Sequence, residues 1–251
     1  MAGPVQGSTV HLRALGLLRR HSELRRYVVV PIGVTIVAAV VLYGGLLAVA
    51  LPAVDRWVGV EGLLGQLLQV VVVVLMLAAV GFVMVRVGVV LGSPWYGQLS
   101  ERVEELATGR APEAEPLTAR GIARDLGRAL RFELAKLAVV LPIAGLLLLS
   151  NLVPVAGQVV STVGGVLLAT FVACLDFLDG PLERRRLSFR QKVRWVRTHL
   201  PGSAGFGLVC VPLLAVPVVN LLWIPLCVAA GTLFWSDAAT REDGVRGTPT
   251  G

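Results

Sequence analysis

The sequence has little charge, few aromatic residues and almost no lysine. Charged residues make up 16% of the 251 residues, against roughly 25% in a water-soluble domain. Aromatic residues make up 6%, whereas hydrophobic residues reach 55% and the mean hydropathy is +0.78. A chain of this length cannot cover a soluble surface with so few charges. We therefore expect an integral membrane protein whose apolar side chains face lipid.

Cysteine is also scarce, and no short metal-binding motif is present. Cys174, Cys210 and Cys227 all lie in apolar runs, their number is odd, and no C-x-x-C spacing occurs. This pattern argues against a disulfide framework or a zinc site and favours small buried apolar residues. The histidines His11, His21 and His199 lie far apart in charged segments, where we interpret them as membrane-interface residues and not as ligands.

The sequence carries no motif for covalent catalysis, nucleotide binding or metal-assisted hydrolysis. It lacks G-x-x-x-x-G-K-[ST], H-E-x-x-H and G-x-S-x-G. We therefore predict no enzymatic activity, no cofactor and no metal. The net charge of +7 comes almost entirely from arginine, and the positive-inside rule accounts for it without nucleic-acid binding.

Four apolar stretches predict the membrane architecture. Residues 27–51 and 63–85 are charge-free and long enough for one spanning helix each. The stretches 137–175 and 198–236 are charge-free over 39 residues each, about twice the length of one span, and each has turn-forming asparagine and proline near its middle. They predict helical hairpins, at 137–178 and 204–235, that dip into the membrane or cross it.

The remaining segments are charged and are expected on the cytoplasmic side. Residues 93–136 contain two amphipathic stripes, which predict a cytoplasmic helical segment. Residues 180–199 form a basic loop, and residues 236–251 are expected to be a flexible tail. The fold class is therefore an all-α polytopic membrane protein: two long transmembrane helices plus two helical hairpins, with amphipathic cytoplasmic helices, in one domain over residues 1–251. Nearly all arginines lie in the N-terminal segment, in 86–136 and in 180–197. Because basic residues favour the cytoplasmic side, both termini are predicted to be cytoplasmic.

Arg25 and Arg26 stand directly before the first predicted span. The start of a helix offers free N–H groups and a positive dipole end to an anion, and two guanidinium groups add forked donors. The pair is thus a candidate oxyanion site. Ordinary positive-inside anchoring explains the same spacing, and this alternative stays open.

Asn151, Gln158 and Asn220 are the polar residues nearest the two hairpin tips. Asparagine at such a tip either satisfies broken backbone or lines a polar path. Both interpretations stay open for these residues, which are our candidates for lining a path.

An ordered series of short motifs resembles the etoposide-induced-protein/CysZ family, from about residue 22 to 236. Leu24-Arg25-Arg26 resembles the family's Gly-hydrophobic-Arg-Arg signature, with Glu23 in place of glycine. Further matches are Pro94-Trp-Tyr-Gly97, Glu133 with Lys136 and Pro142, Pro154-Val-Ala-Gly157-Gln158, Asp179-Gly-Pro181, Phe206-Gly207, Pro217, Asn220, Pro225, Gly231-Thr232 and Trp235.

This resemblance implies a sulfate permease of the inner membrane that supplies cysteine biosynthesis. It implies two spanning helices, two hemi-penetrating hairpins and a homo-oligomer in membrane lipid. It also assigns sulfate binding to Leu24, Arg25 and Arg26, where Glu23 is expected to weaken affinity. The alternative is a non-transporting membrane scaffold that binds anionic lipid or partner proteins through its basic cytoplasmic loops.

Overall fold

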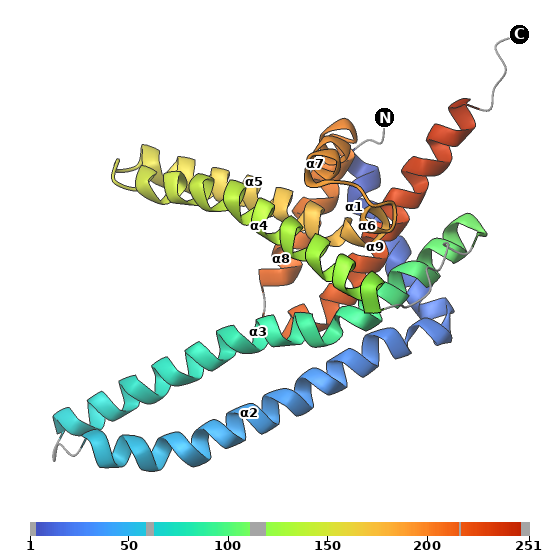
Figure 1. Ribbon diagram of the computed structural model, residues 1–251. Helices are drawn as coiled ribbons and strands as arrows, with labels where there is room; N and C mark the ends of the chain where they lie inside the picture. The colour runs from blue at the N-terminus through green and yellow to red at the C-terminus, as the bar shows by residue number, and fades with distance from the viewer. Residues whose placement is uncertain (1–3, 59–62, 111–118, 216, 247–251) are drawn as a thin grey trace, which may run out of the picture. The chain divides into compact units, whose positions relative to one another are not determined.

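A computed structural model describes residues 4–58, 63–110, 119–215 and 217–246, and these residues form helices without any strand (Figure 1). The helices are α1 (Pro4–Arg20), the 3₁₀ turn η1 (Ser22–Leu24), α2 (Arg26–Val58), α3 (Leu63–Thr108), α4 (Ala119–Ser150), α5 (Ala156–Phe177), α6 (Asp179–Arg184), α7 (Phe189–Thr198), α8 (Gly202–Ala215) and α9 (Pro217–Arg246). The predicted all-α class is confirmed. The chain divides into two compact units, Glu23–Tyr96 and the rest.

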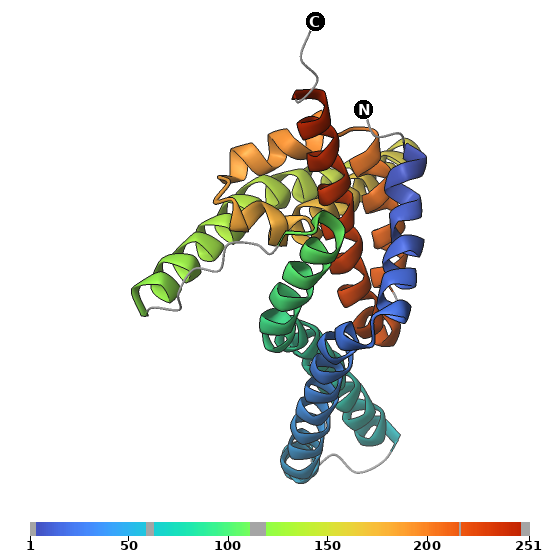
Figure 2. The same cartoon turned by 90° about the vertical axis from the view of Figure 1, so that its right-hand side faces the viewer.

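The Glu23–Tyr96 unit is a long helical hairpin. α2 and the first part of α3 lie side by side (Figures 1 and 2), and the Tyr43 hydroxyl donates to the Leu77 carbonyl at 3.4 Å. α2 continues through Pro31 and Pro52, so it extends beyond the predicted span 27–51. α3 likewise continues past residue 85 to Thr108, so the predicted span and the start of the cytoplasmic segment form one continuous helix.

In the second unit, α4 and α5 form the first predicted hairpin. The turn lies at residues 151–155, between Ser150 and Ala156, within the tip that the sequence indicated. A Cβ on Gly157 would lie 1.7 Å from the Ser150 carbonyl oxygen, so the two arms approach each other here as closely as only glycine permits. Val155 adopts a positive φ of 62° to close the turn. The hairpin is thus a sharply turned pair of helices.

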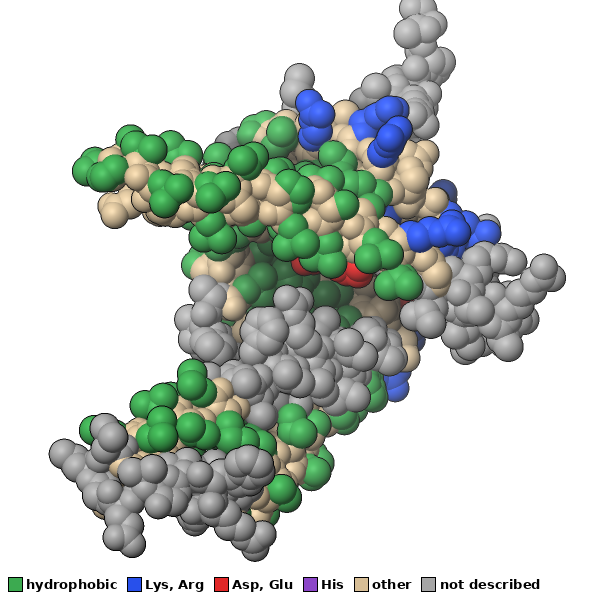
Figure 3. All heavy atoms as spheres, turned by 60° about the vertical axis from the view of Figure 1, so that its left-hand side comes forward, with side chains coloured by type: hydrophobic (Ala, Val, Ile, Leu, Met, Phe, Trp, Pro, Cys, Tyr) green, Lys and Arg blue, Asp and Glu red, His purple; other side chains and the backbone are tan. Residues whose placement is uncertain are grey.

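Hydrophobic side chains cover the outside of this hairpin, and basic side chains appear only away from its end in the view of Figure 3. Only 6% of the α4 segment Leu130–Ser150 is buried within the protein. The exposed residues include Leu141, Leu146, Leu148, Val159, Val163 and Leu167. Exposed apolar surface of this extent is expected to face lipid or another copy of the chain.

α8 and α9 correspond to the second predicted hairpin, but the helices meet earlier than expected. α9 begins at Pro217, and Asn220 and Pro225 lie inside it. Proline is favoured at the first helical position because its missing N–H would have no partner there. Pro217 therefore starts α9, and Pro225 lies within the helix instead of belonging to a broad tip.

α9 also extends to Arg246, where the sequence predicted a flexible tail from residue 236. The Arg13 guanidinium pairs with Asp237, and Arg241 donates to the Gln6 side chain at 2.8 Å. These contacts with α1 hold the end of α9 in helical form. Residues 247–251 lie outside the described part of the chain.

The core of this second unit lies where α1, α5, α8 and α9 meet. α1 packs most closely against α8, and a Cβ on Gly7 would overlap the Gly202 carbonyl at 1.9 Å. The fully buried side chains here include Val10, Leu175, Leu178, Leu182 and Phe206. The predicted basic loop 180–199 is mostly helical, as α6 and α7, and Ser188 with Gln191 forms a capping box at the start of α7.

Four described segments are long and apolar enough to cross a membrane: Ser22–Val49, Leu130–Ser150, Ala156–Phe177 and Leu222–Arg241. They agree with a multi-pass membrane protein. In the predicted span 63–85, the apolar described segment is Gly65–Leu77, and the side chains beyond it lie outside the described residues. α8 is too short to cross, having 14 residues.

Candidate functional site

The predicted anion site lies where the turn η1 meets α2. The Arg25 carbonyl accepts the first helical bonds, from Val28 N–H at 3.0 Å and Val29 N–H at 2.8 Å. Arg25 is therefore the N-cap, and the N–H groups of Arg26 and Tyr27 belong to the first turn, which has no acceptor within the helix. The backbone donors that an oxyanion would use are present at this position.

The three predicted binding residues differ in exposure. Leu24 is fully buried, whereas Arg25 and Arg26 are exposed. Arg26 donates to the Tyr27 hydroxyl at 2.6 Å, and its guanidinium lies 4.7 Å from the centre of the Tyr27 ring. Leu24 thus anchors the turn, while Arg25 and Arg26 lie exposed at the start of the helix.

Asn151 lies in the turn of the α4–α5 hairpin and is engaged in local bonds. Its amide donates to the Leu147 and Leu148 carbonyls at 3.3 and 3.2 Å and to the Ser161 hydroxyl at 3.0 Å. These contacts fit the interpretation in which asparagine satisfies the broken backbone. Gln158 follows on the exposed first turn of α5.

Asn220 belongs to α9, in the other hairpin, so the structure does not gather all three candidates into one turn. Its Oδ1 atom is buried and has no hydrogen-bond partner. An unpaired buried acceptor is unfavourable by roughly 1–3 kcal/mol. Of the three candidates, Asn220 is therefore the residue with an unused polar atom inside the protein.

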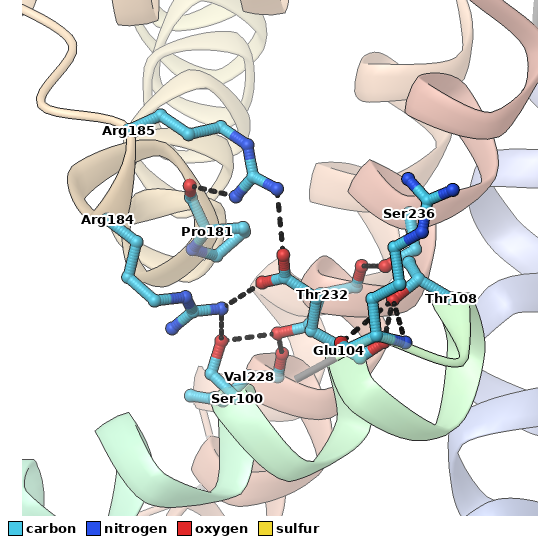
Figure 4. A network of polar contacts seen from close by, with 10 residues as sticks. Ser100, Glu104, Thr108, Pro181, Arg184, Arg185, Val228, Thr232 and Ser236 are labelled. Carbon is cyan, nitrogen blue, oxygen red and sulfur yellow. Dashed lines mark hydrogen bonds and ion pairs between the residues drawn. The ribbon is translucent and has the colours of Figure 1, made fainter. Parts of the chain in front are cut away.

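A buried charge network on the last turns of α3 was not predicted from the sequence (Figure 4). Glu104 is 4% exposed. It accepts from Arg185 at 2.8 Å and pairs with Arg184. Arg184 also donates to the Ser100 hydroxyl at 3.0 Å, which in turn lies 2.8 Å from the Thr232 hydroxyl. The network ties α3, α6 and α9 together.

A buried cation, Lys192 of α7, lies a few residues after Arg184 and Arg185 in the sequence. Its ammonium donates to Asp179 at 2.5 Å and to Glu183 at 2.6 Å and lies 4.3 Å from the centre of the Phe132 ring. Burial raises the pKa of the Asp179 carboxyl, and the Lys192 ammonium opposes that shift. These contacts fix α6 and α7 against the base of α4, so part of the basic segment is structural.

Comparison with known proteins reveals relatives along most of the chain. The sequence pattern of the family described as sulfate transporter CysZ/etoposide-induced protein 2.4 matches residues 10–225. The chain is 30% identical over 235 residues to the sulfate transporter CysZ of Pseudomonas syringae pv. tomato, covering 90% of this chain and 88% of that protein.

The sulfate transporters CysZ of two further bacteria are similarly related. The protein of Pseudomonas paraeruginosa is 28% identical over 228 residues, covering 88% of this chain and 89% of its own length. That of Vibrio parahaemolyticus is 28% identical over 224 residues, with coverages of 85% and 87%. These matches confirm the resemblance seen in the short motifs, and the chain belongs to the sulfate transporter CysZ/etoposide-induced protein 2.4 family.

Proposed function

We propose that the protein is a sulfate permease that conducts sulfate or a similar oxyanion across the cell membrane. The observation that carries this proposal is the near full-length relationship to proteins named sulfate transporters. The apolar segments of the described chain supply the membrane-embedded helices that a permease requires. No enzymatic step is part of the proposal.

We propose Leu24, Arg25 and Arg26 as the sulfate-binding segment. Transfer of a bare dianion into a medium of low dielectric constant is unfavourable by tens of kcal/mol, so fixed donors must replace its water. The first N–H groups of α2 and two exposed guanidinium groups provide such donors. Buried Leu24 keeps the turn in place while the anion binds.

We further propose that the protein acts as a homo-oligomer in the inner membrane, with both termini cytoplasmic, and supplies sulfate for cysteine biosynthesis. The exposed apolar faces of α4 and α5 support lipid contact and self-association. Asn151, Gln158 and Asn220 remain candidates for lining the path, and the unpartnered Oδ1 of Asn220 is the atom that supports this role most directly.

Sulfate flux into vesicles tests the function. Purified protein in liposomes should take up radiolabelled sulfate, and unlabelled sulfate in excess should compete. Vesicles without protein give the background, and chloride and phosphate as competitors give the selectivity. An absence of sulfate uptake above background would contradict the permease and favour a scaffold that binds anionic lipid through the exposed arginines Arg190, Arg194 and Arg197 of α7.

A further inference from the structure

Three metal-ligating side chains from distant parts of the sequence meet inside the second unit. They are His11 of α1, Cys210 of α8 and Cys227 of α9, and their ligand atoms all lie within 4.8 Å of one another. His11 is 5% exposed, and both cysteines are fully buried. The cysteines are free thiols. The fold therefore assembles a compact group of one imidazole and two thiols in its interior.

The imidazole is held with one nitrogen directed at the thiols. His11 Nε2 lies 3.3 Å from Cys210 Sγ, and the other ring nitrogen, Nδ1, lies 3.4 Å from the Ser8 carbonyl oxygen. The ring stacks on Phe206 with centroids 5.0 Å apart. A backbone carbonyl that accepts from one ring nitrogen leaves the lone pair of the other for a ligand, as is usual for metal-bound histidine.

We propose that His11, Cys210 and Cys227 bind a zinc ion. Two thiolates and a neutral imidazole form a soft donor set, which excludes Mg²⁺ and Ca²⁺ and favours zinc or copper(I). The net charge of the occupied site decides between zinc and copper(I). Two thiolates neutralise a divalent ion, whereas copper(I) would leave a net negative charge in a buried site, which is unfavourable.

The spacing of the three ligand atoms suits zinc. With Zn–S near 2.3 Å and Zn–N near 2.0–2.1 Å, tetrahedral geometry places two sulfurs about 3.8 Å apart and sulfur about 3.6 Å from nitrogen. The three atoms already lie within 4.8 Å of one another, so no separation has to shorten by more than about 1 Å to reach tetrahedral spacing. Three protein ligands leave the fourth zinc position to water or another small ligand.

The ion would join α1 to α8 and α9. Sequence motifs for zinc sites rely on ligands that lie close together in the chain. They cannot detect this group, because 199 residues separate His11 from Cys210. The proposal is independent of sulfate transport, because it rests on ligand geometry and does not use the start of α2.

Zinc titration of the purified full-length protein, freed of metal by a chelator, tests the site. We expect one zinc per chain by elemental analysis, and a rise in melting temperature of about 5–10 °C at a hundredfold excess over the dissociation constant. Replacement of zinc by cobalt(II) should give a thiolate-to-cobalt charge-transfer band in the unmutated protein. Absence of that band and of stoichiometric zinc would overturn the proposal without relying on any variant.

Variants assign the ligands. Cys210→Ser, Cys227→Ser and His11→Ala should each lose the zinc-dependent rise in melting temperature. Cys174→Ala is the matched control, since Cys174 is also a buried free thiol but bonds to the Ser203 carbonyl and stands outside the group of three. If Cys174→Ala alone loses zinc, or if all three ligand variants keep it, the assignment is wrong.

Discussion

At the start of α2, the role of the positive charge of Arg25 and Arg26 can be tested separately from the role of their planar guanidinium groups. Arg25→Lys with Arg26→Lys keeps both positive charges, and therefore the topology, but removes the planar fork that fits an oxyanion. We expect normal membrane insertion and clearly weaker sulfate binding, measured by calorimetry. Because hydrogen bonds to charged groups contribute roughly 1.5–3 kcal/mol each, replacing both arginines with alanine should weaken binding more than about a hundredfold.

Glu23 gives the complementary test at the same turn. Its carboxylate is a like-charged neighbour of a bound anion, so Glu23→Gly should strengthen sulfate binding. Unchanged affinity in both the double-lysine variant and Glu23→Gly would contradict the site and leave simple anchoring of α2 as the role of the arginines.

Glu104 offers a test of stability at a single residue. Glu104→Ala removes the carboxylate that pairs with Arg184 and Arg185. Hydrogen bonds to charged groups contribute roughly 1.5–3 kcal/mol each, and water screens the pair with Arg185 because its side chain is 41% exposed. We expect a marked fall in melting temperature in detergent. Glu105→Ala is the matched control one residue along α3, because Glu105 pairs with Arg102 at the surface, where a pair contributes about 0–1 kcal/mol. Equal destabilisation by the two changes would contradict the network.

The sequence could place Glu104 on a helix but could not find its partners. The predicted apolar stripe consists of Leu99, Val103 and Leu106, of which Leu99 and Val103 are fully buried, whereas Leu106 is 41% exposed. Glu104 lies directly beside this stripe, yet its partners Arg184 and Arg185 come 80 and 81 residues later. Helical periodicity reports which face is buried and carries no information on a contact across that distance.

Among the helices, the α4–α5 turn depends on one glycine. Gly157→Ala would place a methyl group 1.7 Å from the Ser150 carbonyl oxygen, and overpacking of this kind typically costs about 1–3 kcal/mol. We expect a lower melting temperature and more aggregation on size-exclusion chromatography. Gly145→Ala in α4 is the control, because a Cβ there meets nothing within 4 Å, and it should be neutral or stabilise by about 0.5–1 kcal/mol. Equal behaviour would refute the close approach.

The helices were predictable from the sequence to different degrees. The first hairpin was found with its tip, because Asn151 and Pro154 interrupt a long charge-free run at the place where the turn lies. For the second hairpin, the predicted tip begins at Pro217, but α9 already begins there. Proline is compatible with both a turn and the first residue of a helix, so the sequence does not distinguish the two. The helical end of α9 was missed, because its contacts to Arg13 and Gln6 come from the other end of the chain.

For the whole molecule, the arginine-rich segments predict that both termini are cytoplasmic. Small tags at residue 1 and residue 251 should be protected from an impermeant labelling reagent in intact cells and become accessible after the cells are permeabilised. A tag inserted within 52–62, the link between the two predicted spans, is the control and should be labelled from outside. Labelling of either terminus in intact cells would overturn the predicted orientation.

The pairing of α1 with α8 and α9 has a consequence for synthesis of the protein on the ribosome. α1 is made first, but its partner helices begin at Gly202 and Pro217. At 5–20 residues per second, α1 would wait roughly 10–40 s for them. During that interval its apolar residues Val10 and Ala14, buried in the finished protein, have no helix to cover them. The nascent chain is then most exposed to misassembly, and a transcript that stops before codon 202 yields an N-terminus with nothing to dock against.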